Sequence, residues 1–306
     1  MKYYIVLISL VLSLEARSQS FTARQKVYDH AFAELNGMLN DSVPLSFKRA
    51  VFLSENAYLD NQGDYVKFDN QIKWLANRAL TIAAQSHLAY YESDKERVKK
   101  YAAVFRLMTD TIKFYQDSSR FYETRPYRYD FEDFWGEKDW RKMFVSKLLY
   151  TNSGNCHSLP FLYKILCEEI GEKAFLSMAP NHTYIKLRCK KLGWYNTELT
   201  NAHFPIDAWI MASGYVPLVA VQNRIYMDTL SDKQSIAVSM IDLAKGYERK
   251  FGDYANLDFI IKCCDLALSH YPKYVNGLIL KAETQKKRFE KIMKVHGAEF
   301  PSDIFG

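Results

Sequence analysis

The feature that most constrains the fold is a change of apolar spacing between residues 153 and 200. A helix-like apolar run begins at Cys156 and extends to Ile170. Two strand-like runs follow it, over residues 181–187 and 193–200, in which the side chains alternate in character. A helical period followed at once by a strand period indicates a mixed fold rather than an all-helical one. We therefore expect an α+β protein.

The apolar spacing divides the rest of the chain into three regions. Residues 22–117 have helical periodicity, with one stripe continuing from Val98 to Tyr115. Residues 118–230 mix helix, strand and loop patterns and contain the run described above. Residues 231–306 contain three amphipathic helical patterns. We expect a helical N-terminal region, a mixed core and a helical tail, in that order.

The helical tail resembles about one and a half tetratricopeptide repeats. The resemblance rests on the spacing of four residues, Ala267, Pro272, Leu278 and Ala282. Fewer than three such repeats do not form a free-standing solenoid. We therefore expect the tail to pack on the core, and its alternative role is to bind a partner protein.

Residues 115–140 are rich in aromatic side chains that follow no regular period. Aromatic residues serve packing as readily as recognition. We expect this segment to pin the N-terminal helices onto the core. The alternative is that it lines a groove for a peptide or sugar substrate.

The N-terminus has the pattern of a signal peptide. Lys2 supplies the positive charge, and residues 3–14 form an apolar run of twelve residues. This run is too short to span a bilayer as a helix, which takes about 20 residues. We expect residues 1–18 to be removed. The mature chain is then exported to the periplasm or the extracellular space, without stable insertion in a membrane.

Charge and composition exclude several classes of function. The chain of 306 residues has a net charge of +6, but acidic and basic residues alternate and no basic block occurs, so we expect no nucleic-acid partner. With only 12 glycines it has no glycine-rich phosphate-binding loop, which argues against nucleotide chemistry. The five cysteines leave at least one thiol unpaired in an exported protein, and we expect no disulfide framework.

A cysteine, a histidine and a carboxylate lie in that order on the expected helix and strands. Cys156 follows a Gly-Asn turn at the start of the helix, where the helix dipole and free N–H groups favour the thiolate. His182 follows 26 residues later and Glu198 a further 16 residues on. These residue types suit a thiol nucleophile, a general base and a group that orients the base.

Several residues together resemble the transglutaminase-like superfamily, in its bacterial branch. They are Ser153-Gly154-Asn155-Cys156, His182 and Gly193-Trp194-x-x-x-Glu198-x-Thr200. The resemblance covers roughly residues 141–210. It implies a papain-like core, with an antiparallel sheet packed on the Cys-bearing helix and a triad of Cys156, His182 and Glu198.

The chain departs from the superfamily at two places. The superfamily usually has Asp at the position of Glu198, so Asn196 and Asn201 are alternative groups for orienting the imidazole. The residues directly after Cys156 also differ from the usual acidic and small ones. The resemblance implies hydrolysis or acyl transfer at a peptide or carboxamide bond through a thioester, without a cofactor. The alternative is a catalytically degenerate scaffold that binds a protein or cell-envelope partner.

Two further histidines compete for a role at the site. His157 is a rival base, but consecutive helical residues do not face each other. Cys156, His157, His182 and His203 are also suitable metal ligands by type. No C-x-x-C or H-E-x-x-H spacing supports them, so we expect no metal site.

Overall fold

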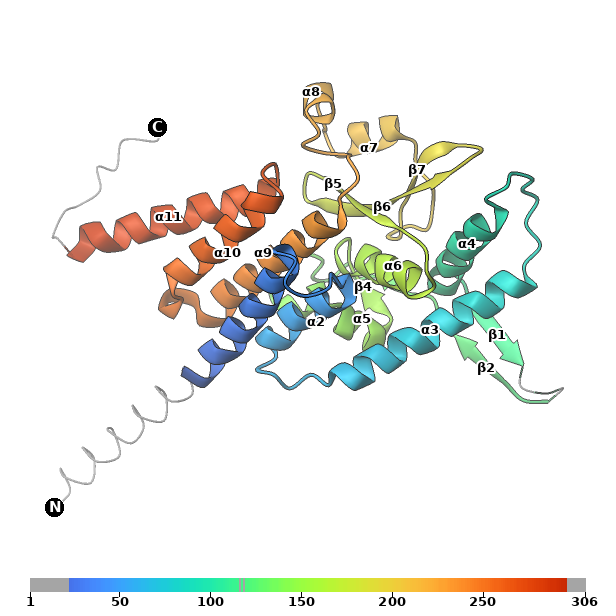
Figure 1. Ribbon diagram of the computed structural model, residues 1–306, viewed down its shortest axis with the longest axis horizontal. Coiled ribbons are helices and arrows are strands. Elements are labelled where there is room, and N and C mark those ends of the chain that lie inside the picture. Colours follow the sequence, from blue (N-terminus) through green and yellow to red (C-terminus); the bar gives the residue numbers. More distant parts are fainter. Residues whose placement is uncertain (1–21, 116, 118, 296–306) are drawn as a thin grey trace, which may run out of the picture. The chain divides into compact units, whose positions relative to one another are not determined.

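The structure is a computed structural model that describes residues 22–115, 117 and 119–295, and its contacts divide the chain into two compact units (Figure 1). The first unit contains residues 22–63, 236–272 and 276–295, and the second contains residues 64–235 and 273–275. The helical region expected over residues 22–117 therefore contributes to both units. The expected leader, residues 1–18, lies outside the described residues.

The first unit is helical. Its elements are a helix over residues 22–39, α2 (Phe47–Tyr58), most of α9 (Asp232–Phe251), η2 (Gly252–Tyr254), α10 (Leu257–His270) and most of α11 (Val275–Val295). Its core contains a cluster of aromatic rings, in which the ring centroids of Tyr28 and Tyr247 lie 5.0 Å apart and those of Tyr247 and Phe259 4.5 Å apart. The three helices α9, α10 and α11 confirm the three amphipathic patterns predicted for the tail.

The second unit begins with two helices and a hairpin. Its first elements are α3 (Tyr65–Gln85), α4 (Lys95–Thr109), β1 (Ile112–Tyr115) and β2 (Phe121–Thr124). The prediction of helical spacing as far as Tyr115 is wrong, because α4 ends at Thr109 and the next residues pair antiparallel with β2. The rings of Phe114 and Tyr122, which are directly opposite in the register, stack across this hairpin at 5.2 Å.

The core of the second unit surrounds α6. Its elements are β3 (Arg128–Tyr129), η1 (Trp140–Met143), α5 (Val145–Thr151), β4 (Ser153–Gly154), α6 (Ser158–Glu169), β5 (Phe175–Ala179), β6 (His182–Cys189), β7 (Gly193–Thr197), α7 (Asp207–Ser213) and α8 (Leu218–Gln222). The strands β5, β6 and β7 form an antiparallel sheet in that order, and β3 pairs with β4 in parallel. Helix α6 packs against β5, β6, α3, α4 and α5. The protein is thus α+β, as predicted.

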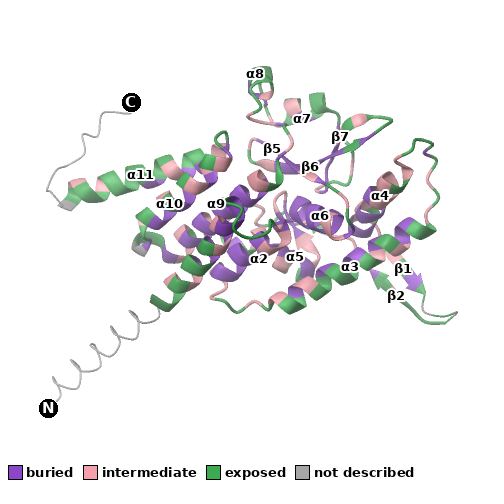
Figure 2. Cartoon of the chain, in the orientation of Figure 1, coloured by how far each residue is buried: buried purple, intermediate pink, exposed green. Residues whose placement is uncertain are grey.

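Burial explains why α6 has this central place. Ten consecutive residues, from Ser158 to Cys167, are buried, and the helix is coloured almost wholly as buried in Figure 2. A helix that is apolar on all sides must be covered on all sides. The sheet covers one side and the neighbouring helices cover the rest, so the start of α6 is held firmly in place.

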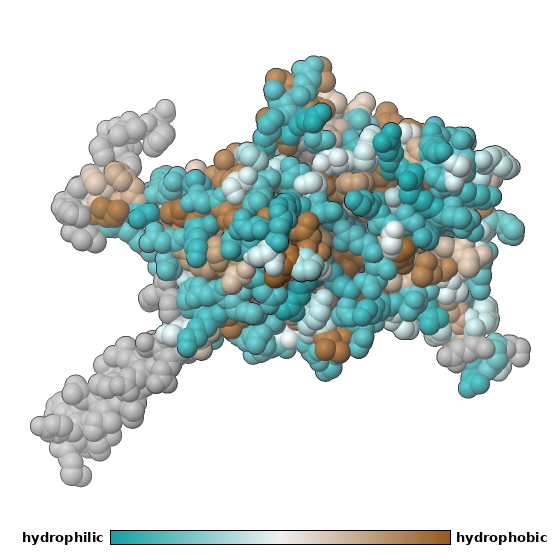
Figure 3. All heavy atoms as spheres, viewed as in Figure 1, coloured by the Kyte–Doolittle hydropathy of each residue, from teal (hydrophilic) through white to brown (hydrophobic). Residues whose placement is uncertain are grey.

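The outer surface is largely polar on the face shown in Figure 3, with small apolar areas scattered across it. Within the part of the chain that the structure describes, no helix combines the length and the apolar character needed to cross a membrane.

Candidate active site

The turn before α6 is built around Asn155. Its side chain is fully buried, and Oδ1 accepts hydrogen bonds from the backbone N–H groups of His157 at 3.1 Å and Ser158 at 3.0 Å. The Ser158 hydroxyl accepts in return from the Asn155 N–H at 3.1 Å. This reciprocal cap fixes the backbone on both sides of Cys156. The regular helix runs from Ser158 to Glu169, and the cap at Asn155 begins its first turn at Cys156, where the sequence predicts the start.

Gly154 is required at this turn for a steric reason. A Cβ atom at this position would lie 2.6 Å from the Ser158 hydroxyl and 2.7 Å from a methyl group of Leu148. Both distances are shorter than any ordinary contact. The glycine therefore lets the chain pass close to α5 and α6 immediately before the nucleophile candidate.

Cys156 differs from the other cysteines in its surroundings. All five cysteines are free thiols, and the other four are buried, whereas Cys156 is half-buried at the start of α6. Its Sγ atom lies 3.8 Å from the carbonyl oxygen of Asn181, in the turn between β5 and β6. The thiol is thus in contact with the residue that directly precedes His182.

His182 lies between Cys156 and Glu198. It is the first residue of β6, and its Nε2 atom lies 2.6 Å from Oε2 of Glu198. Burial opposes protonation of the ring. Hydrogen bonds with the Cys156 thiol and the Glu198 carboxylate outweigh it and raise the pKa of His182 to about 10. Because Nε2 faces the carboxylate, Nδ1 is the ring nitrogen left for the thiol.

Glu198 is buried directly beyond the end of β7. It is 4% exposed, and its backbone pairs with that of His203 through hydrogen bonds of 2.9 and 3.1 Å. Its second oxygen, Oε1, accepts from the N–H of Thr200 at 2.9 Å and from the Thr200 hydroxyl at 2.8 Å. Burial raises the pKa of this carboxyl, but its hydrogen bonds with His182 and Thr200 lower it more, so the net shift is downward.

The structure therefore brings together the three side chains that the sequence selects. The alternative groups for orienting the imidazole lie elsewhere. Asn196 donates to Pro205 O at 3.0 Å and to Asp207 at 2.7 Å, and Asn201 contacts the ring of His203.

The other two histidines point to different partners. The Nδ1 atom of His157 lies 3.1 Å from the carbonyl oxygen of Met143, and its ring packs 4.0 Å from that of Phe161. The ring of His203 packs edge-on against Trp209, with centroids 5.1 Å apart. Among the described residues, no group of three or more His, Cys, Asp and Glu side chains is arranged to hold a metal ion.

Two residues near the triad have roles that the motif does not reveal, although Thr200 is part of the motif. Thr200 fixes the carboxylate, and Tyr129 lies beside the thiol because β3 pairs with β4 so that Tyr129 is opposite Gly154. Burial, followed by the charges of Cys156 and Glu198, raises the pKa of Tyr129 to about 12. Thr200 is two residues from Glu198 and could be found by spacing. Tyr129 could not, because a two-residue strand has no detectable period.

The backbone N–H groups near Cys156 differ in whether they have a hydrogen-bond acceptor. The N–H groups of His157 and Ser158 are both occupied by Asn155. The N–H of Cys156 has no acceptor among the residues that the structure describes. It is therefore the donor that is free to bind an anionic oxygen beside the sulfur.

Comparisons with known proteins do not add a relative. The chain matches no protein-family model, and no curated protein or solved structure is significantly similar to it.

Proposed function

We propose that the protein is a cysteine-dependent hydrolase or acyltransferase with a transglutaminase-like, papain-like core, acting on a peptide or carboxamide bond. The observation that carries the proposal is the position of His182. Its Nε2 atom lies 2.6 Å from the Glu198 carboxylate, and the carbonyl oxygen of the residue before it, Asn181, lies 3.8 Å from the Cys156 thiol. A three-stranded antiparallel sheet packed on the helix that follows the cysteine is consistent with such a core.

The first half of the proposed reaction forms a thioester. His182, whose pKa of about 10 makes it a strong base, takes the proton of the Cys156 thiol. The sulfur attacks the carbonyl carbon, and the N–H of Cys156 binds the resulting oxyanion. His182 then gives its proton to the leaving amine as the carbon–nitrogen bond breaks. The amine departs and the acyl group remains on Sγ.

The second half releases the acyl group. His182, now neutral, takes a proton from water as the water oxygen attacks the thioester carbon. The carbon–sulfur bond breaks, giving a carboxylic acid and the Cys156 thiolate, with the imidazolium restored. An amine in place of water gives transfer instead, and we favour hydrolysis. Throughout, Glu198 holds the ring and stabilises its positive charge.

Alkylation of the thiols tests this proposal. Brief treatment with iodoacetamide, followed by peptide mass spectrometry, should label Cys156 well before the buried thiols such as Cys189 in β6, which is 4% exposed. His182→Gln should slow the labelling of Cys156 at pH 7 and leave the labelling of Cys189 unchanged. Equal labelling of all five thiols, or none at Cys156, would contradict a reactive nucleophile.

Export and partner binding belong to the same proposal. Export to the periplasm or extracellular space depends on residues 1–18, which lie outside the described part of the chain.

Measuring turnover distinguishes the enzyme from the alternative, a catalytically degenerate scaffold that binds a partner. A folded Cys156→Ala variant that hydrolyses test peptides as fast as the unmodified protein would remove the enzyme assignment.

A further inference from the structure

The second unit contains a pocket of about 970 Å³ whose lining ends three residues before Cys156 in the chain. Tyr129 and Ser153 are among the residues that line it. Tyr129 pairs with Gly154 across β3 and β4, and Gly154 is two residues before Cys156. The pocket wall therefore adjoins the turn that carries the thiol.

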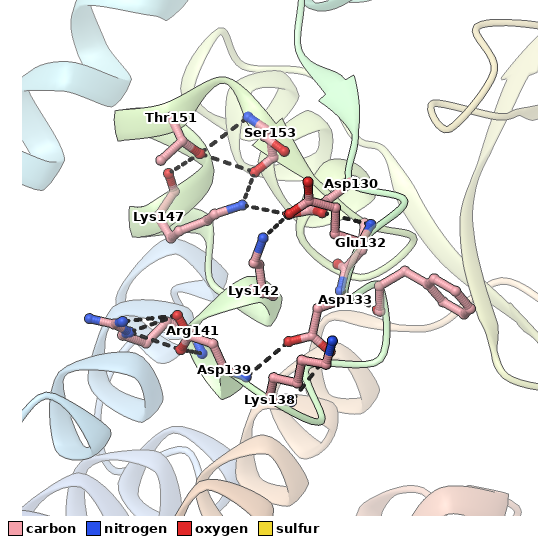
Figure 4. Close-up of polar contacts among 12 residues, drawn as sticks. Asp130, Glu132, Asp133, Lys138, Asp139, Arg141, Lys142, Lys147, Thr151 and Ser153 are labelled. Carbon is pink, nitrogen blue, oxygen red and sulfur yellow. Dashed lines mark hydrogen bonds and ion pairs between the residues drawn. The ribbon is translucent and has the colours of Figure 1, made fainter.

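One part of the pocket is electrically balanced by its own side chains. Asp130 is buried, and its carboxylate contacts Lys142 at 2.5 Å and Lys147 at 3.2 Å (Figure 4). Burial opposes ionisation of Asp130, but the hydrogen bonds from these lysines lower its pKa to about 2. Glu132 adds a second negative charge close to Lys142. Two positive and two negative charges thus compensate one another.

A second part of the pocket is not balanced. Arg125 and Arg128 are exposed and line the pocket, and neither guanidinium group has a hydrogen-bond or ion-pair partner among the described residues. Glu123, the remaining acidic residue of the lining, lies directly opposite Lys113 in the register of β1 and β2. Two arginines with unpaired guanidinium groups therefore line one cavity.

An exposed aromatic ring completes the pocket. Phe131 lines it and is 81% exposed, and its ring lies 5.0 Å from that of Tyr129, edge-on. A ring this exposed contributes little to the core. It is instead an exposed apolar surface in the same lining as the two arginines.

We propose that this pocket binds the carboxylate of a peptide substrate, with Arg125 and Arg128 as the anion site and Phe131 as the surface for a neighbouring side chain. Guanidinium groups match carboxylates in geometry and form charge-assisted hydrogen bonds with them. The proposal rests on the proposed function, since it places the substrate of the same thiol. The carboxylate belongs either to the peptide's C-terminus or to an acidic side chain, which present the same chemistry.

Two matched pairs of thiol reagents test the proposal. N-chloroacetylphenylalanine is compared with its amide, and the α-amide of N-chloroacetylglutamate with that of N-chloroacetylglutamine. Each pair differs only by a carboxylate in place of a carboxamide, at the C-terminus in the first and on a side chain in the second. The rate of labelling at Cys156 is measured by mass spectrometry in the unmodified protein and in Arg125→Gln, Arg128→Gln and the double variant.

The carboxylate reagent of one pair should label Cys156 faster than its amide, and that pair identifies the source of the carboxylate. The rate ratio should fall by about two- to fivefold for each arginine removed, as expected of exposed ion pairs. Arg224→Gln, at a position that is 78% exposed and outside the pocket, should leave the ratio unchanged. Ratios that are the same in the unmodified protein and the double variant would overturn the proposal.

A second measurement separates the pocket from the chemistry. Binding of N-acetylphenylalanine and of the α-amide of N-acetylglutamate to Cys156→Ala is followed by ligand-observed NMR. Binding that weakens in Cys156→Ala/Arg125→Gln/Arg128→Gln supports the pocket even if Cys156 proves inert to iodoacetamide, which would count against the proposed function alone. If neither carboxylate binds to Cys156→Ala, and Cys156 of the unmodified protein is also inert, the proposed pocket is overturned as well.

Discussion

The Nε2 atom of His182 lies 2.6 Å from one oxygen of Glu198, while Thr200 holds the other oxygen with two hydrogen bonds. The carboxylate is 4% exposed, so water does not compete for it freely. An imidazole whose partner is fixed in this way keeps one orientation toward the thiol. Each part of this arrangement can be tested separately.

Glu198→Gln should lower the pKa of His182, because it removes a negative charge that helps hold the ring protonated. A less basic ring is a weaker proton acceptor for the Cys156 thiol. Alkylation by iodoacetamide should slow by about tenfold or more, the effect of one unit in a pKa. The measurement is the pH profile of the labelling rate. Glu198→Asp keeps the negative charge, so its labelling rate should lie between those of the unmodified protein and Glu198→Gln. An unchanged pH profile in Glu198→Gln would contradict the pairing of Glu198 with His182.

The ion pair between His182 and Glu198 should make the free energy of unfolding fall at both high and low pH. Folding raises the pKa of His182 from 6.5 to about 10, so its contribution is fully present below pH 6.5 and is lost as the pH rises toward 10. Folding lowers the pKa of Glu198 from 4.5, so its contribution is present above pH 4.5 and is lost in stronger acid. Glu198→Gln should therefore lose most stability, relative to the unmodified protein, between pH 4.5 and 6.5. Urea unfolding across this range measures it, and a constant difference at every pH would speak against the ion pair.

Thr200→Val removes the hydroxyl that donates to Glu198 at 2.8 Å but keeps the backbone donor. A hydrogen bond to a charged group is worth about 1.5–3 kcal/mol, so the free energy of unfolding should fall by about that amount. The pKa of His182, followed by NMR of its ring protons, should also fall because the carboxylate is held less firmly. Thr200→Ser retains the hydroxyl and serves as the control. A Val variant that matches the Ser variant in both measurements would show that the hydroxyl is unimportant.

Asn155→Ala should cost about 1 kcal/mol of stability through loss of the helix cap, and should also slow the alkylation of Cys156. The second effect follows because the cap fixes the backbone on both sides of the thiol. Asn256 caps α10 in the same way, with Oδ1 accepting from Asp258 N at 3.0 Å and Phe259 N at 3.4 Å. Asn256 is exposed and lacks the further bonds that the buried Asn155 donates to Phe134 O and Met143 Sδ. Asn256→Ala should therefore lose less stability, measured by thermal unfolding, with no change in labelling. If both variants label at the same rate, the cap of α6 has no special link to the nucleophile.

The sequence predicts the central helix and two of the three strands of its sheet because their apolar patterns are long enough to show a period. It places the start of the helix at Cys156, directly after the residue that caps it, whereas the regular part of α6 begins at Ser158. It misses β5 (Phe175–Ala179), where four of the five residues are buried and no alternation marks a strand. Hydrophobic patterns reveal strands with one exposed face better than strands covered on both.

The residues of the candidate site also divide into those that the sequence reveals and those that it does not. Cys156, His182 and Glu198 could be selected from sequence because each lies at a definite place in a helix or strand pattern. Arg125, Arg128 and Tyr129 could not, because they lie in a segment without a period, and two short parallel strands bring it beside the thiol. Pairing between residues about 25 positions apart leaves no mark on local composition.

The turn between β5 and β6 joins two parts of the site through adjacent residues. Asn181 has a left-handed backbone with φ of 54° and its carbonyl oxygen faces Cys156, and the next residue is His182. Adding or deleting a single residue here would rotate the imidazole to the opposite face of the sheet. Natural variants of this hairpin should therefore differ in side chains and keep a constant length. Loop grafting that ignores this constraint should give folded but inert proteins.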